Sequence, residues 1–117
     1  MLFTQKSEVD IHEMSPLALA FVGDAVLELL VRARLVGTTR LQPNRLHTVA
    51  THYVSAHAQN LELDIIEPML TDAEAAVLRR GKNASKATVA KHATVQEYRA
   101  STGFECLLGW LYLNGQL

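Results

Sequence analysis

Two acidic side chains interrupt apolar stretches of this sequence. Asp24 stands in the middle of LALAFVGDAVLELLV (residues 17–31), with Glu28 four residues later, and Glu105 is the only charged residue of FECLLGWLYL (residues 104–113). Burying an ionised carboxylate without a partner costs several kcal/mol. Asp24 therefore either lies on an exposed face of its helix or meets a positive group.

A helical bundle would allow these two distant acids to meet. Packed antiparallel, the two apolar segments could place Asp24 beside Glu105. Carboxylates at close range repel each other, and one becomes protonated unless a divalent cation lies between them. Oxygen ligands without a His or Cys partner suit Mg²⁺ or Mn²⁺ rather than Zn²⁺. Our hypothesis is a Mg²⁺ site, with Mn²⁺ as the alternative ion.

The elements that must position these acids are all helical. Apolar residues recur at helical spacing, and no segment alternates as a strand would. Serine, proline, capping-box and glycine signals mark the expected ends. The pattern predicts helices from Ser15–Pro16 to about Leu35 near Gly37, from Pro43 or Asn44 through RLHTVATHYVSAHAQNLEL (residues 45–63) with Leu61 on its apolar stripe, from Thr71 to a stop at Gly81, and from Thr94 to Asn114–Gly115.

Composition sets limits on the class of protein. The 117 residues are 49% hydrophobic and 20% charged, which is typical of one globular domain, and the net charge is −1. Cys106 lies in an apolar run, which indicates a packing role rather than a nucleophilic one. It is the single cysteine of the sequence, which favours a reducing, cytoplasmic location. The first apolar segment approaches the length of a membrane span, but Asp24 and Glu28 oppose insertion, so we expect no membrane association.

A basic window follows the third predicted helix. Residues 75–96 contain no acid but five of the eleven Lys and Arg residues, together with polar donors. This window is either a solvated surface loop or a binding site for phosphates. Aromatic residues are absent from it, which favours duplex backbone over stacked single strands. The RNA-binding candidates are Arg79, Arg80, Lys82, Asn83, Lys86 and Lys91.

Both acidic segments resemble those of the ribonuclease III family. LAFVGDAVLEL resembles the family's signature segment, and TGFECLLGWLYLNG resembles its second acidic segment. The finer pattern of SPLALAFVGDAV, VSAHAQ, RRGKNA and YRASTGFECLLGWLYL is similar to Mini-ribonuclease III, the form of the catalytic domain that stands alone. The resemblance covers nearly all of residues 1–117, and we expect one ribonuclease III catalytic domain without a double-stranded-RNA-binding domain.

The resemblance implies a fold and an activity. The fold would be the all-helical bundle of the ribonuclease III endonuclease domain. The protein would be a homodimeric, Mg²⁺-dependent endoribonuclease that cleaves double-stranded RNA and matures both ends of the 23S ribosomal RNA precursor. A large-subunit ribosomal protein would help to present that RNA. Asp24 and Glu105 carry over as the catalytic, metal-binding acids, and the window from Arg79 to Lys91 carries over as an RNA-contacting loop.

Two positions depart from the full-length family pattern. Ala20 and Thr102 stand where full-length relatives carry two further acids, so fewer carboxylates would hold an ion. Glu28 and Glu13 are possible substitutes, although a surface acid is the simpler interpretation of Glu28. The departures also admit a rival function, a non-catalytic RNA- or ribosome-binding module with the same fold. A helical dimerisation protein without a nucleic-acid role is a third interpretation.

Overall fold

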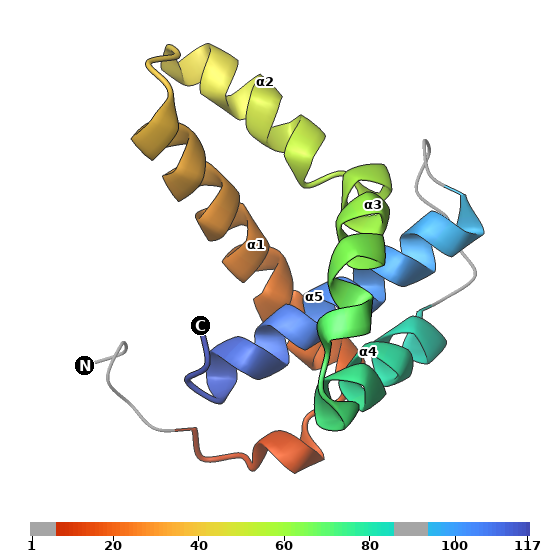
Figure 1. Ribbon diagram of the computed structural model, residues 1–117. Coiled ribbons are helices and arrows are strands. Elements are labelled where there is room, and N and C mark those ends of the chain that lie inside the picture. Colours follow the sequence, from red (N-terminus) through yellow and green to blue (C-terminus); the bar gives the residue numbers. More distant parts are fainter. Residues whose placement is uncertain (1–6, 86–93) are drawn as a thin grey trace.

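The computed structural model describes residues 7–85 and 94–117, and these residues form an all-α fold. The elements in chain order are η2 (Ile11–Glu13), α1 (Pro16–Thr38), α2 (Pro43–Tyr53), α3 (Ala56–Ile66), η3 (Glu67–Met69), α4 (Asp72–Ala84) and α5 (Val95–Leu113). Figure 1 shows α5 crossing α1, with α3 and α4 beside α5. α2 and the C-terminal half of α1 extend away as a hairpin. The predicted fold class is confirmed.

α1 begins and ends close to the predicted residues. Ser15 is the N-cap, its hydroxyl accepts a hydrogen bond from the Ala18 amide at 3.1 Å, and Pro16 occupies the first turn. Gly37 lies one residue before the end of the helix. Within residues 7–85 and 94–117, no helix combines the length and apolar character that a membrane span requires.

The prediction of a single helix through residues 45–63 is wrong, because the helix is interrupted at Val54 and Ser55, between α2 and α3. Val54 leaves the helical conformation, and the hydroxyl of Ser55 accepts a hydrogen bond from the Ala58 amide at 3.1 Å as the N-cap of α3. A serine that caps a new helix competes with continuation of the old one. The break changes the helical phase, so Leu61 is 52% exposed and Leu63 is buried instead.

The last two helices have the predicted capping boxes but not both predicted ends. Thr71 with Glu74 opens α4, and Thr94 with Glu97 opens α5. The stop expected at Gly81 is wrong, since α4 continues to Ala84. Gly81 is instead buried against α5, where an added Cβ would lie 2.7 Å from the Cβ of Cys106. The glycine serves close helix packing there rather than helix termination.

α1 and α5 cross at backbone contact. A Cβ on Gly23 would overlap the carbonyl oxygen of Glu105, and a Cβ on Gly109 would overlap the carbonyl oxygen of Leu19. The core surrounds this crossing in three clusters of buried side chains. The clusters consist of Leu19, Ala20, Val77 and Cys106; of Val26, Leu27, Phe104 and Leu108; and of Leu63, Leu78 and Ala100. The residue before Asp24 therefore lies against the main chain of Glu105.

Candidate active site

Asp24 and Glu105 lie together where α1 crosses α5. Asp24 is exposed and Glu105 is partly buried. Burial and the neighbouring Asp24 carboxyl group raise the pKa of Glu105 from its ordinary value of 4.5 to about 8. The predicted meeting of the two acids is confirmed. Of the two alternatives for Asp24, the structure shows the first: its side chain lies on an exposed face of α1, whereas Glu105 is partly buried.

The donor set of this pair fits a hard divalent cation. Both side chains offer carboxylate oxygens, and the ion pairs of the described residues include neither Asp24 nor Glu105. A cation between them would remove the repulsion that raises the pKa of Glu105. No group of three or more His, Cys, Asp or Glu side chains suited to a metal occurs in the part of the chain that the structure describes. The remaining ligands of such an ion would be water or phosphate oxygens.

The residues at the two departing positions have other roles. Ala20 packs in the core with Leu19, Val77 and Cys106. The buried Thr102 hydroxyl donates a hydrogen bond to the carbonyl oxygen of Tyr98 at 3.1 Å and lies at hydrogen-bond distance, 3.3 Å, from the Ser85 hydroxyl. Both positions therefore serve packing between α5 and its neighbours and contribute no negative charge.

The surface interpretation of Glu28 is confirmed. The Arg32 guanidinium donates a hydrogen bond to the Glu28 carboxylate at 3.1 Å, one turn further along α1. Glu13 lies exposed in η2. Glu28 is therefore neutralised at the surface by its own helix and supplies a natural comparison for Asp24.

Gln59 is a site residue that the sequence analysis missed. Its side-chain Nε2 donates to the Glu105 carboxylate at 3.4 Å and to the Val54 carbonyl oxygen at 2.9 Å. Its side chain is 2% exposed. A signal exists in the sequence, because Gln59 precedes Leu63 by one helical turn on the buried face of α3. That face becomes visible only when the helix is known to begin after Ser55.

The candidate RNA-binding residues separate into three groups. Arg79 and Arg80 are exposed on α4. Lys82 forms an ion pair with Glu67 at 3.6 Å, and the exposed Asn83 accepts a hydrogen bond from the Arg99 guanidinium at 3.2 Å. Lys86 and Lys91 lie outside the described residues.

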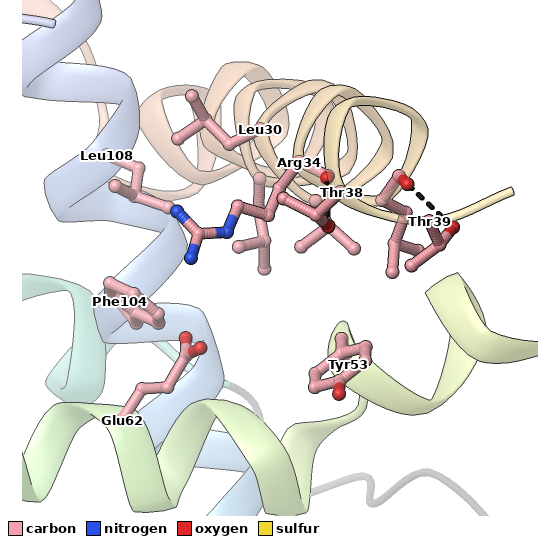
Figure 2. A pocket seen from close by; sticks show the side chains of 11 residues that line it. Leu30, Arg34, Thr38, Thr39, Tyr53, Glu62, Phe104 and Leu108 are labelled. Carbon is pink, nitrogen blue, oxygen red and sulfur yellow. Dashed lines mark hydrogen bonds between the residues drawn. The ribbon is translucent and has the colours of Figure 1, made fainter.

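A cavity of about 500 Å³ opens between α1, α3 and α5, and its lining includes neither Asp24 nor Glu105. Figure 2 shows Arg34 reaching from α1 towards Phe104 and Leu108, and Glu62 pointing into the same space from α3. Burial raises the pKa of the Glu62 carboxyl group. Phe104 and Leu108, which line this cavity, lie on α5, the helix that also carries Glu105.

Cys106 is confirmed as a packing residue. It is 1% exposed, and its thiol contacts the carbonyl oxygen of Val77. Burial raises the pKa of this thiol to about 11. A thiol that stays protonated at neutral pH is a poor nucleophile.

The fold and the acidic pair define a class of nuclease. The model of the Ribonuclease III domain matches residues 17–116. A solved structure of a protein from Fusobacterium nucleatum superimposes with a TM-score of 0.81 at 29% identity, over 96% of this chain and 87% of that one. The chain belongs to the ribonuclease III domain family and is an endoribonuclease.

Within that family the similarity is to one group. Mini-ribonuclease 3 of Enterococcus faecalis is 46% identical over 92% of this chain and 83% of its own length. Mini-ribonuclease 3 of Symbiobacterium thermophilum is 48% identical over 88% of this chain and 79% of its own length. The predicted membership of the Mini-ribonuclease 3 group is confirmed.

Proposed function

We propose that this endoribonuclease cleaves double-stranded RNA with the help of a divalent cation, Mg²⁺ or Mn²⁺, held by Asp24 and Glu105. The observation that carries the proposal is the convergence of these two carboxyl groups from α1 and α5. Because the two carboxyl groups repel each other when both are charged, the site favours a bound cation. Its exposed side would let a phosphate reach that cation.

The two acids would have different tasks. A bound cation supplies positive charge to the phosphate oxygens and lowers the pKa of the attacking water. Asp24, which is exposed, would hold the ion at the surface where a phosphodiester can reach it. Glu105, which is partly buried and fixed by the contact between its main chain and Gly23, would set the position of the ion.

The basic end of α4 would contact the RNA backbone. Arg79 and Arg80 are exposed and free to reach phosphates, and Lys86 and Lys91 extend the same run of positive charge in the sequence. Lys82 and Asn83 already contact Glu67 and Arg99, so their contacts with RNA would replace or share these interactions. A-form duplexes are bound mainly through backbone and 2′-hydroxyl groups.

A homodimer would allow both strands to be cut. One acidic pair can hydrolyse one phosphodiester at a time, and a two-fold axis would place a second pair across the duplex. Phe21, three residues before Asp24 on α1, is 83% exposed, and Leu29 on the same helix is 65% exposed. Large apolar side chains exposed on one element favour an interface.

The resemblance to stand-alone members of the family supports a physiological substrate. We infer that the enzyme matures both ends of the 23S ribosomal RNA precursor in the cytoplasm, with a large-subunit ribosomal protein presenting the RNA. A buried free cysteine suits a reducing compartment.

Cleavage of a plain RNA duplex tests the catalytic proposal. We expect cleavage with Mg²⁺ or Mn²⁺ and none with chelator, and we expect Asp24→Asn to lower the rate about 100-fold or more, because several kcal/mol of charge stabilisation are lost. Glu28→Gln is the matched control, since it removes a carboxylate one turn away on the same helix. It should cut at the parent rate.

Equal rates for Asp24→Asn and the parent protein would contradict the assignment. The rival function, a non-catalytic RNA-binding module, has one observation in its favour, the absence of acids at Ala20 and Thr102. It predicts that the parent protein binds the duplex with either ion and leaves it intact.

A further inference from the structure

Gln59 is a buried polar side chain that contacts the acidic pair. It is 2% exposed and lies in the first half of α3, a helix that packs against α5. Both bonds that it donates come from Nε2, one to the Val54 carbonyl oxygen at 2.9 Å and one to the Glu105 carboxylate at 3.4 Å. The stronger bond fixes the amide plane, and the weaker one is directed at the site.

Helix-junction support alone does not account for an amide at this position. The Val54 bond uses a single N–H group, and Ser55 already caps α3. The amide oxygen Oε1 is buried and has no partner among residues 7–85 and 94–117. A buried acceptor without a partner costs free energy, which an apolar side chain of similar volume would avoid. The feature that distinguishes glutamine from such a side chain here is its second N–H group and the carboxylate that this group meets.

We propose that Gln59 is the positioning residue that holds Glu105 in place to bind the cation beside Asp24. This inference rests on the proposed function. The N–H donated to Oε2 opposes the repulsion by Asp24 and leaves Oε1 of Glu105 free of that bond. A site with only two carboxylates depends strongly on the orientation of each. Hydrogen bonds of this kind orient metal ligands throughout proteins and are commonly long before the ligand binds.

Binding of Mn²⁺ in the absence of RNA tests the inference directly. Mn²⁺ is titrated into the full chain, and free ion is followed by electron paramagnetic resonance. We expect Gln59→Met, an unbranched apolar side chain of similar length, to bind Mn²⁺ about tenfold more weakly than the parent protein. Gln59→Leu serves the same purpose if the methionine variant does not fold. Circular dichroism checks the fold of each variant.

Ser55→Ala is the matched control. It removes the N-cap of the same helix and lowers stability without removing the group that contacts Glu105. We expect its Mn²⁺ affinity to equal that of the parent protein, so a loss confined to the Gln59 variants excludes a merely structural effect. In a Glu105→Gln background, replacing Gln59 should leave the residual affinity unchanged.

The outcomes separate the two proposals. Parent-like Mn²⁺ affinity in the folded Gln59 variants, with affinity lost in Asp24→Asn, overturns the role of Gln59 and leaves the metal site intact. Equal affinity in Asp24→Asn and the parent protein overturns the metal site and the role of Gln59 together. A tenfold loss in the Ser55→Ala control also overturns the positioning role, because local stability would then explain the effect.

Discussion

The carboxyl groups of Asp24 and Glu105 share too small a space for both to be charged without compensation. The sequence predicts this pair because each acid interrupts an apolar stretch, where a charged residue needs an explanation. Gln59 gives no comparable signal, because an amide carries no charge and its burial depends on where α3 begins. Acidic residues inside apolar stretches can therefore be recognised in the sequence. The uncharged polar groups that contact them can be recognised only when the start of each helix is known.

The pH dependence of stability should report the state of Glu105. Its pKa is raised to about 8 in the metal-free folded protein, so the folded state binds this proton more tightly than the unfolded state. The corresponding stability is fully present below about pH 4.5 and is lost as pH rises through 8. We expect Glu105→Gln to remove this decline. At pH 8.5 the variant should unfold at a higher urea concentration than the parent protein, and its free energy of unfolding should be larger by on the order of 2 kcal/mol.

The measurement is urea unfolding followed by circular dichroism at pH 5 and pH 8.5, with chelator present. Glu28→Gln serves as the control for losing one carboxylate from the surface, and its curve should change with pH as the parent curve does. A parent protein with equal stability at both pH values, once the shared background is subtracted, would contradict the raised pKa of Glu105.

Among the elements, the crossing of α1 and α5 determines the site. The sequence predicts both helices well, because a serine–proline start and a capping box mark their beginnings. It does not predict that Gly23 and Gly109 mark a backbone contact, since glycine within a helical pattern is also compatible with a helix end. The same ambiguity explains the error at Gly81, where tertiary packing rather than local conformation requires the glycine.

Substitution of the crossing glycine should be severe. Gly23→Ala places a Cβ on the carbonyl oxygen of Glu105, so α1 and α5 must separate. We expect a loss of roughly 3 kcal/mol or more in the free energy of unfolding, in the range of severe overpacking. Thermal unfolding measures this change, and Mn²⁺ binding by the folded fraction should fall with it.

Gly37→Ala is the control on the same helix. A Cβ there meets nothing within 4 Å, so the change removes only the poor helix propensity of glycine. We expect a gain of up to about 1 kcal/mol. If both alanine variants unfold at the same temperature, the backbone contact at Gly23 does not limit the packing.

At the scale of the whole molecule, α1 exposes several large apolar side chains that assembly into a dimer would cover. Phe21, Leu29 and Val36 on α1 are each at least 65% exposed, and a cavity bordered by Phe104 and Leu108 opens between α1 and α5. The alternation of buried and exposed faces on α1 was hidden in the sequence, because apolar residues occur on nearly every side of this helix. A second chain could cover these side chains and supply the second acidic pair.

We expect Phe21→Ser to weaken dimerisation of the protein. The parent protein should sediment as a dimer at micromolar concentration, and loss of a large apolar contact should raise the dissociation constant at least tenfold. Analytical ultracentrifugation measures the change. Met69→Ser, at a residue that is 71% exposed on η3, is the control and should sediment as the parent does. A monomeric parent protein would contradict the homodimer.

The bare backbone contact between Gly23 and Glu105 gives the site an unusual mechanical character. Side chains can change rotamer to absorb a nearby substitution, but two main chains in contact cannot. The anchor points of the two acids are thus tied to the relative placement of two whole helices and are shielded from local rearrangement. Directed evolution of this enzyme should consequently tolerate changes in the surrounding side chains far more readily than any added atom at the crossing.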